Sequence, residues 1–195
     1  MDTVAFWQLI ADSIEHASGR SARERFLRDQ LTALDPVDIV AFQALLNLAH
    51  NRALTWDLWG AAARICGGWC SDDGFDYFRL WLIGQGSATY EHAVASPDSL
   101  DDVPAVNRLA GRHRREWDDE EEWPEWESLG FVAAEAYELA GGRGGECGGD
   151  FYAAVESWLG GVAFKRAPDG ERWTAKDEAA AALKIPSLAA SFPLG

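Results

Sequence analysis

Three charged residues recur about one helical turn apart in the most aromatic stretch of the chain. Asp72, Asp76 and Arg79 are spaced i, i+4 and i+7, so they share one stripe of a helix. Carboxylates that converge between helices can hold a divalent cation or share a proton, and an arginine beside them can orient an anionic substrate. The stripe also suits a structural ion pair, because buried charges persist only when they are paired. A ligand site and an ion pair are therefore both compatible with this pattern.

Further acidic residues and one histidine could contribute to the same pocket. Asp73 lies in the first turn of the helix, where a carboxylate also stabilises the positive end of the helix dipole. Glu135 and Glu138 are spaced i, i+3 and so share a helix face. The candidate ligand-binding residues are Asp57, Asp72, Asp73, Asp76, Arg79, His92, Glu135 and Glu138. The histidines are scattered and the cysteines lack a zinc-site spacing, so we predict neither a metal nor a cofactor.

The elements that would position these residues are predicted to be helices, because apolar residues recur with a helical period. The predicted helical segments are 4–17, 21–34, 36–49, 56–66, 72–83, 90–96, 129–139, 151–159 and 175–183. The segment 72–83 is apolar on almost every side, which is typical of a central helix. We therefore predict an all-α fold, with one helical domain over residues 1–195 and a buried central helix.

Two stretches of the C-terminal half depart from the helical pattern. Residues 141–149 are Gly-rich but lack the Gly-Lys-Ser/Thr ending of a phosphate loop, so we interpret them as a flexible connection. Residues 162–166 and 171–173 flank Ala-Pro-Asp-Gly at 167–170, which is a turn sequence. These residues could close a small β-hairpin, although two short strands alone are marginally stable.

Residues 105–127 form an acidic, Trp-rich segment in which a short block of arginines runs into a longer block of Asp and Glu. Charge runs of this kind are normally solvated. Trp117, Trp123 and Trp126 lie within the acidic block, and three indoles are not left in water without packing partners. Either they pin the segment to the body of the protein, which we favour, or they present an acidic-aromatic patch to a partner.

The net charge argues against two classes of partner. Lys and Arg number 17 against 32 for Asp and Glu, and the resulting charge of -15 repels nucleic-acid phosphates and anionic lipids. No window approaches the roughly 18 apolar residues of a membrane span, and the N-terminus does not resemble a signal peptide. Cys66, Cys70 and Cys147 are an odd count that suits no disulfide framework. We expect a cytoplasmic protein that binds neither nucleic acid nor membranes.

Several short motifs are similar, in the same order, to those of one bacterial family. They are FWQLI at 6–10, WDLW at 56–59, CSDDGFDYFRLWLIGQG at 70–86, PDSL at 97–100 and AEAYE at 134–138. On these motifs the chain resembles the family catalogued as domain of unknown function 4240, over about residues 4–140. The resemblance implies a single helical unit and carries no particular activity with it. The acidic Trp-rich segment and the Gly-rich run depart from the family pattern.

Two classes of function fit these observations. The first is a binding, interaction or regulatory protein whose acidic surface recruits a basic protein partner, since complementary charge accelerates association. We favour it because the motifs assemble no set of nucleophile, base and oxyanion donors. The alternative is an enzyme or small-ligand binder, in which Asp72, Asp76, Arg79 and Glu135 line a pocket between helices.

Overall fold

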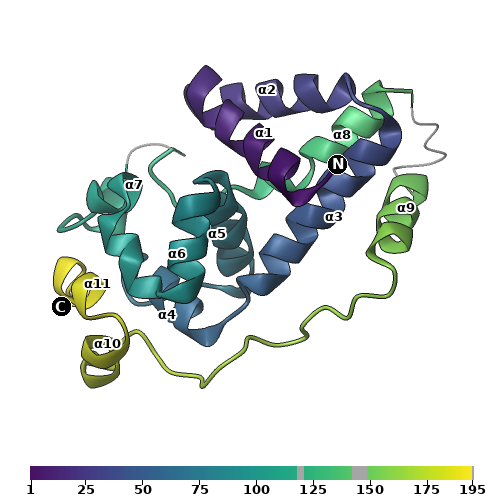
Figure 1. Ribbon diagram of the computed structural model, residues 1–195. Helices are drawn as coiled ribbons and strands as arrows, with labels where there is room; N and C mark the ends of the chain where they lie inside the picture. The colour runs from purple at the N-terminus through teal and green to yellow at the C-terminus, as the bar shows by residue number, and fades with distance from the viewer. Residues whose placement is uncertain (118–120, 142–148, 195) are drawn as a thin grey trace.

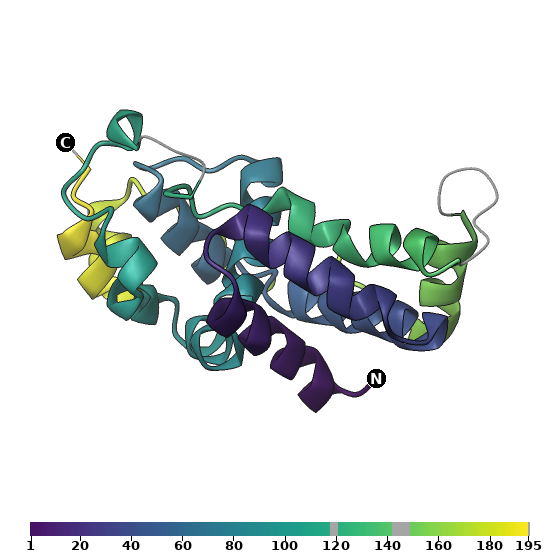
Figure 2. The same cartoon turned by 90° about the horizontal axis from the view of Figure 1, so that it is seen from above.

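Two groups of helices pack against each other where α3 meets α5 (Figure 1). The computed structural model describes residues 1–117, 121–141 and 149–194. The first group contains α1 (Thr3–His16), α2 (Arg20–Thr32), α3 (Pro36–Arg52) and α8 (Val132–Leu139). The second group contains α4 (Trp56–Ile65), α5 (Asp72–Gly84), α6 (Ser87–Ala95) and α7 (Pro104–Asn107). Seen from above, α1 and α2 run in opposite directions, and α8 lies beside α2 (Figure 2).

The remaining helices connect or cover these groups. The 3-10 helices are η1 (Pro97–Asp102), η2 (Arg114–Glu116) and η3 (Glu127–Gly130). The C-terminal helices are α9 (Gly149–Leu159), α10 (Glu178–Lys184) and α11 (Pro186–Ser191). α9 packs on α3 of the first group, whereas α11 packs on η1 and α4 of the second. The predicted all-α fold is confirmed.

Side-chain caps set the starts of the helices that matter for the site. The Thr55 hydroxyl accepts a hydrogen bond from the Leu58 amide at 3.2 Å, and Ser71 accepts one from Gly74 at 3.0 Å. These caps satisfy amides that the first helical turn leaves without a partner. The helix predicted over 175–183 begins only at Glu178 as α10, with the Asp177 carboxylate accepting from the amides of the first turn.

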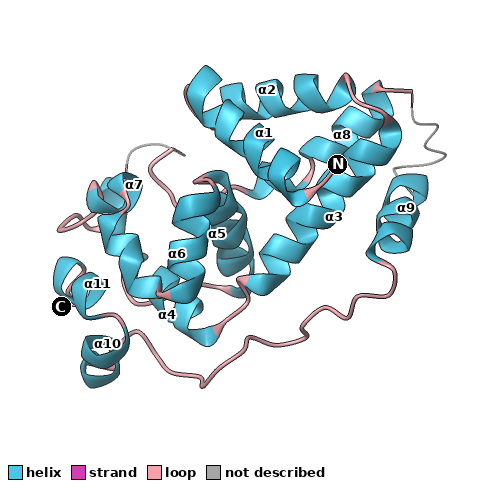
Figure 3. Cartoon of the chain, in the orientation of Figure 1, coloured by secondary structure: helices cyan, strands magenta, loops and turns pink. Residues whose placement is uncertain are grey.

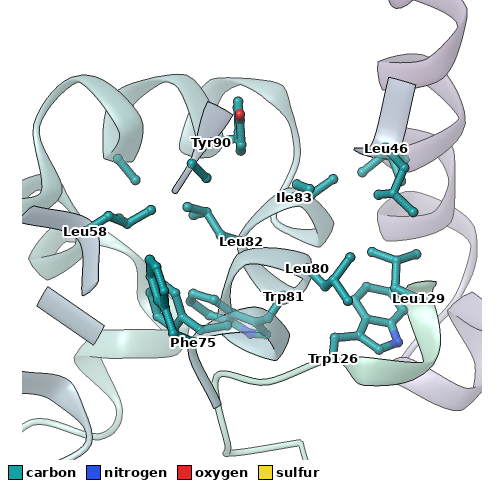
Figure 4. Close-up of a cluster of buried hydrophobic side chains, with 14 of the residues drawn as sticks. Leu46, Leu58, Phe75, Leu80, Trp81, Leu82, Ile83, Tyr90, Trp126 and Leu129 are labelled. Atoms are coloured by element: carbon teal, nitrogen blue, oxygen red, sulfur yellow. The ribbon is translucent and has the colours of Figure 1, made fainter. Parts of the chain in front are cut away.

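α5 is the buried central helix that the sequence predicts. Side chains from its whole length pack between Leu58 of α4, Leu46 of α3 and Tyr90 of α6 (Figure 4). Its core residues are Phe75, Phe78, Leu80, Trp81, Leu82 and Ile83. α3 is also enclosed, since every residue from 39 to 46 is buried. Both helices lie at the contact between the two groups, which is why neither shows a simple one-sided apolar pattern.

The segment 160–177, here called the strap, crosses the molecule from α9 to α10 as an extended chain (Figure 1). The predicted small β-hairpin over 162–173 does not form, and the described residues contain no β-strand (Figure 3). Instead the strap pairs with the start of α4: Trp56 donates its amide to Asp169 at 2.9 Å, and Asp169 donates to Leu54 at 3.1 Å. The backbone thus finds its partners outside its own turn.

The acidic Trp-rich segment is held to the body by its indoles. Trp117 and Trp126 are buried, and Trp123 is half-buried against Trp117 with ring centroids 4.9 Å apart. The Trp126 ring lies over Gly84 of α5, and its indole nitrogen donates to Glu24 at 2.6 Å. The interpretation that the indoles pin this segment is confirmed for its described residues. The Gly-rich connection predicted at 141–149 lies largely outside the described residues.

Among the described residues, no helix is both long enough and apolar enough to cross a bilayer.

Candidate functional site

A large open cleft lies between α4, the start of α5 and the strap. Its volume is about 1280 Å³, and residues from all three elements line it. Four of the predicted ligand-binding residues come together on its α5 side, namely Asp72, Asp73, Asp76 and Arg79. These four predicted residues therefore share one wall of this cleft.

A row of stacked aromatic rings crosses this cleft. The ring centroids of Trp56 and Trp59 are 5.2 Å apart, those of Trp59 and Phe75 are 4.8 Å apart, and both pairs are nearly parallel. A guanidinium closes each end: Arg172 of the strap lies 5.0 Å from the Trp56 ring, and Arg79 lies 5.0 Å from Phe75. Because each ring face is covered by its neighbour, the row offers mainly ring edges to the cavity, which form an apolar wall.

Opposite charges occupy the two ends of the cleft. At the α5 end, Asp72 and Asp73 are exposed, and neither carboxylate has an ion-pair partner among the described residues. At the strap end, Arg166 and Arg172 are exposed, and no described carboxylate pairs with them. Trp69 adds an indole that is 60% exposed, in the loop that precedes Asp72. The cleft is therefore polarised along its aromatic row.

Asp76 and Arg79 form the ion pair that their spacing allowed. Arg79 is buried, and its guanidinium pairs with the Asp76 carboxylate while donating to the His50 carbonyl at 2.9 Å. Burial lowers the pKa of Arg79, and Asp76 opposes this shift. Burial and the nearby Arg79 also lower the pKa of His50. The Asp76 side chain is 51% exposed, so it faces both its partners and the cavity.

The strap is fastened across the cleft by Trp173. Its ring lies directly on Gly60 of α4, where an added Cβ would come within 2.2 Å of ring carbon Cζ2. Its indole nitrogen donates to the Asp57 carboxylate at 2.8 Å, and Lys184 of α10 donates to the same oxygen at 2.8 Å. Asp57 thus binds both the strap and α10, and it does not line the cleft.

The remaining predicted site residues lie elsewhere. Glu135 of α8 is exposed and pairs with Arg28 of α2 at 3.0 Å, so it does not line the cleft with Asp72, Asp76 and Arg79. Glu138 and His92 are exposed and also lie outside the cleft. Spacing placed the two glutamates on one helix, but that helix belongs to the other group.

Sequence reasoning missed a second, polar pocket that adjoins the cleft along α5. Gln43, Asn47 and His50 of α3 line a cavity of about 390 Å³ that shares Asp73 and Asp76 with the cleft. Gln43 donates to Asn47 at 2.9 Å, and its own buried oxygen has no partner among the described residues. The available signal was their spacing of i, i+4 and i+7 within a largely apolar helix. Trp69 and the strap arginines carried no such local signal.

The cleft contains groups that can bind and orient a ligand. Within the described residues, no three His, Cys, Asp or Glu side chains are grouped closely enough to hold a metal ion. The Ser71 hydroxyl lies at the cleft and serves as the cap of α5. What the cleft presents is an apolar wall, free carboxylates and free guanidiniums, which can fix the orientation of a ligand.

Comparison with known proteins gives a family for the larger part of the chain. No curated protein and no solved structure matches the chain significantly. The family model described as Protein of unknown function (DUF4240) matches residues 1–139. These residues supply every helix from α1 to α8, and with them the α4 and α5 walls of the cleft, whereas the strap follows the matched region. The chain therefore belongs to the DUF4240 family.

Proposed function

We propose that this protein binds a small zwitterion with an apolar body in the cleft between α4, α5 and the strap. The observation that carries the proposal is the polarity of the cleft, with free carboxylates at Asp72 and Asp73 and free guanidiniums at Arg166 and Arg172. The ligand's cationic group would lie at the α5 end and its anionic group at the strap end. The aromatic row between them would contact its body.

The cationic end has a specific complement. Trp69 has an exposed indole and lines the cleft. It lies three residues before Asp72, the first residue of α5. An ammonium held over an aromatic face at an exposed site gains about 0.5–1 kcal/mol, and a nearby carboxylate adds to this. Since a zwitterion carries no net charge, the protein's overall charge of -15 does not repel it.

We locate the function in the cleft rather than on the acidic Trp-rich segment. Two carboxylates of that segment are engaged within the chain: Glu121 accepts from the Arg20 amide at 2.6 Å, and Glu122 pairs with Arg112 at 2.6 Å. Its indoles pack inward. We also propose a cytoplasmic location, since the neighbouring free thiols of Cys66 and Cys70 suit a reducing compartment.

Three probes with the same body test this proposal. Phenylalanine is a zwitterion, phenylalaninamide keeps only the cation, and N-acetylphenylalanine keeps only the anion. Isothermal titration should give the tightest binding for the zwitterion. The double variant Asp72→Asn/Asp73→Asn should weaken the binding of phenylalanine and phenylalaninamide, which carry the cation. The double variant Arg166→Gln/Arg172→Gln should weaken the binding of phenylalanine and N-acetylphenylalanine, which carry the anion. Each exposed charge contact is worth up to about 1 kcal/mol, which is about fivefold in affinity.

Matched controls separate a site from a general charge effect. Asp29→Asn and Arg25→Gln change exposed charges of α2, far along the chain from the cleft, and should leave all three affinities unchanged. Trp69→Ala should weaken the cationic probes, whereas Trp158→Ala, which removes an exposed indole of α9, should not. Equal binding of the three probes, or no saturable binding of any, would refute the proposal.

A further inference from the structure

A second large cavity lies at the C-terminal end of α4, and basic side chains line it. Its volume is about 820 Å³, and it is enclosed by the end of α4, residues 111–115 and the C-terminal segment from Lys176 to Leu194. It shares no lining residue with the cleft between α4, α5 and the strap. A concentration of positive charge is unexpected on a chain whose net charge is -15.

Three of its cations are free to meet a ligand. Arg114, Arg115 and Lys176 are exposed, and no described carboxylate pairs with them. The other two cations are occupied, since Arg64 binds Glu178 at 2.8 Å and Arg112 binds Glu122 at 2.6 Å. Glu178 is the one acidic residue among the described lining residues, and both its oxygens are bound by Arg64. Within the described part of the chain, the cavity therefore carries three cations that no carboxylate pairs with.

Two glycines allow these cations to converge. Gly67 and Gly68 follow α4 with φ values of 78° and 92°, a backbone conformation that other residues rarely adopt. A Cβ on Gly67 would lie 4.0 Å from Cδ of Arg114, and one on Gly68 would lie 3.4 Å from Cε of Lys176. Arg114 and Lys176 thus extend over adjacent residues of one turn, although they are distant in the sequence.

The floor of the cavity carries a buried donor without a partner. Arg64 is 1% exposed, and its two terminal nitrogens donate to Glu178 and to the carbonyls of Ala175 and Ala189. Its Nε has no hydrogen-bond partner among the described residues. Arg64 fixes the C-terminal segment on α4, and it adds to the positive potential of the cavity that it lines.

We propose that this cavity binds the phosphate group of a small organic phosphate. A phosphate monoester is close to a dianion at neutral pH, and arginine forks match its oxygens. The cavity is much larger than a phosphate ion and falls in the range of small-molecule sites. Phe192, Pro193 and Leu194 provide an apolar surface for the organic part. This site is independent of the cleft between α4, α5 and the strap.

The protein's overall charge sets the conditions under which such binding is measured. At physiological ionic strength charges further apart than about 8 Å are largely screened, whereas cations in contact with the anion are not. Repulsion by distant carboxylates therefore weakens the binding of the anionic ligand only slightly. Titration calorimetry at this ionic strength should show saturable binding of phenyl phosphate. Phenyl sulfate, which has the same shape and one charge fewer, should bind several-fold more weakly, and benzyl alcohol should not bind.

Variants of the free cations decide whether the cavity is responsible. Arg114→Gln/Lys176→Gln should weaken phenyl phosphate by up to about fivefold for each charge removed. Arg25→Gln is the matched control, since it removes an exposed arginine of α2 and should have no effect. Binding of zwitterionic phenylalanine to the double variant should equal that of the wild type, which separates the two proposals. Unchanged phenyl phosphate affinity in the double variant, no binding to the wild type, or equal affinity for phenyl sulfate would overturn the assignment.

Discussion

Replacing Gly60 with alanine should destabilise the protein, although the same change stabilises most helices. Gly60 lies inside α4, and alanine there would normally contribute about 0.5–1 kcal/mol. Here the new Cβ would stand 2.2 Å from Cζ2 and 2.5 Å from Cε2 of the Trp173 ring. Because real Cβ contacts are never this short, Trp173 must move, and its hydrogen bond to Asp57 moves with it.

The size of the effect follows from these opposing terms. Overpacking a well-filled contact costs about 1–3 kcal/mol, and a lost hydrogen bond adds about 0.5–1.5 kcal/mol. The helix-propensity gain is smaller, so the free energy of unfolding should fall by about 1–3 kcal/mol. For a chain of this length each kcal/mol lowers the melting temperature by about 2–4 °C. The zwitterion cleft should also lose affinity, because Arg172 precedes the displaced ring.

A double-mutant cycle provides the assay. Urea denaturation followed by circular dichroism would compare the wild type, Gly60→Ala, Trp173→Ala and the double variant. Once the indole is removed, Gly60→Ala should become stabilising, so the sign of the effect should invert. Gly130→Ala is a control, since its Cβ would meet Leu80 at an ordinary 3.5 Å. The reasoning fails if Gly60→Ala stabilises the wild type as it would an ordinary helix.

Two further predictions concern titrating side chains. A hydrogen bond with Cys70 and burial raise the pKa of the Cys66 thiol. Iodoacetamide at neutral pH should therefore label half-exposed Cys70 well before Cys66, as followed by peptide mapping. Equal labelling rates of the two thiols would contradict this. Burial and Arg79 lower the pKa of His50 below its usual 6.5. As the pH falls below 6.5, the imidazole is therefore protonated in the unfolded chain before it is protonated in the folded one. The free energy of unfolding then decreases. Urea denaturation at about pH 7 and about pH 5 should show a smaller loss for His50→Gln than for the wild type, and identical losses would exclude this origin.

Local patterns in the sequence were enough to predict the α4–α5 side of the fold. Apolar residues on every side of 72–83 indicated the central helix, and the caps Thr55 and Ser71 lie where the pattern begins. The Asp76–Arg79 pair could be foreseen because three residues along a helix fix the geometry. Each of these inferences depends on a few neighbouring residues, whose relative positions a helix determines by itself.

Features that depend on distant residues could not be predicted in this way. Asp57 looked like a ligand-binding residue because nothing nearby reveals that Trp173 and Lys184 will bind it. The strap has no periodicity, and its turn sequence suggested a hairpin because local propensity cannot show that Asp169 will pair with Leu54 and Trp56. The guanidinium end of the cleft was missed for the same reason.

Glycines inside the helices hold the signal that would have revealed these long-range contacts. A glycine in a helix interior costs about 1 kcal/mol relative to alanine, so its presence indicates a close approach by another group. Gly60 receives the ring of Trp173, and Gly84 receives that of Trp126, where an added Cβ would lie 2.5 Å from ring carbon Cε3. Gly60 and Gly84 thus each mark the place where an indole from a distant segment packs on a helix. Such a contact holds both the strap and the acidic Trp-rich segment against a helix, and the strap completes the cleft.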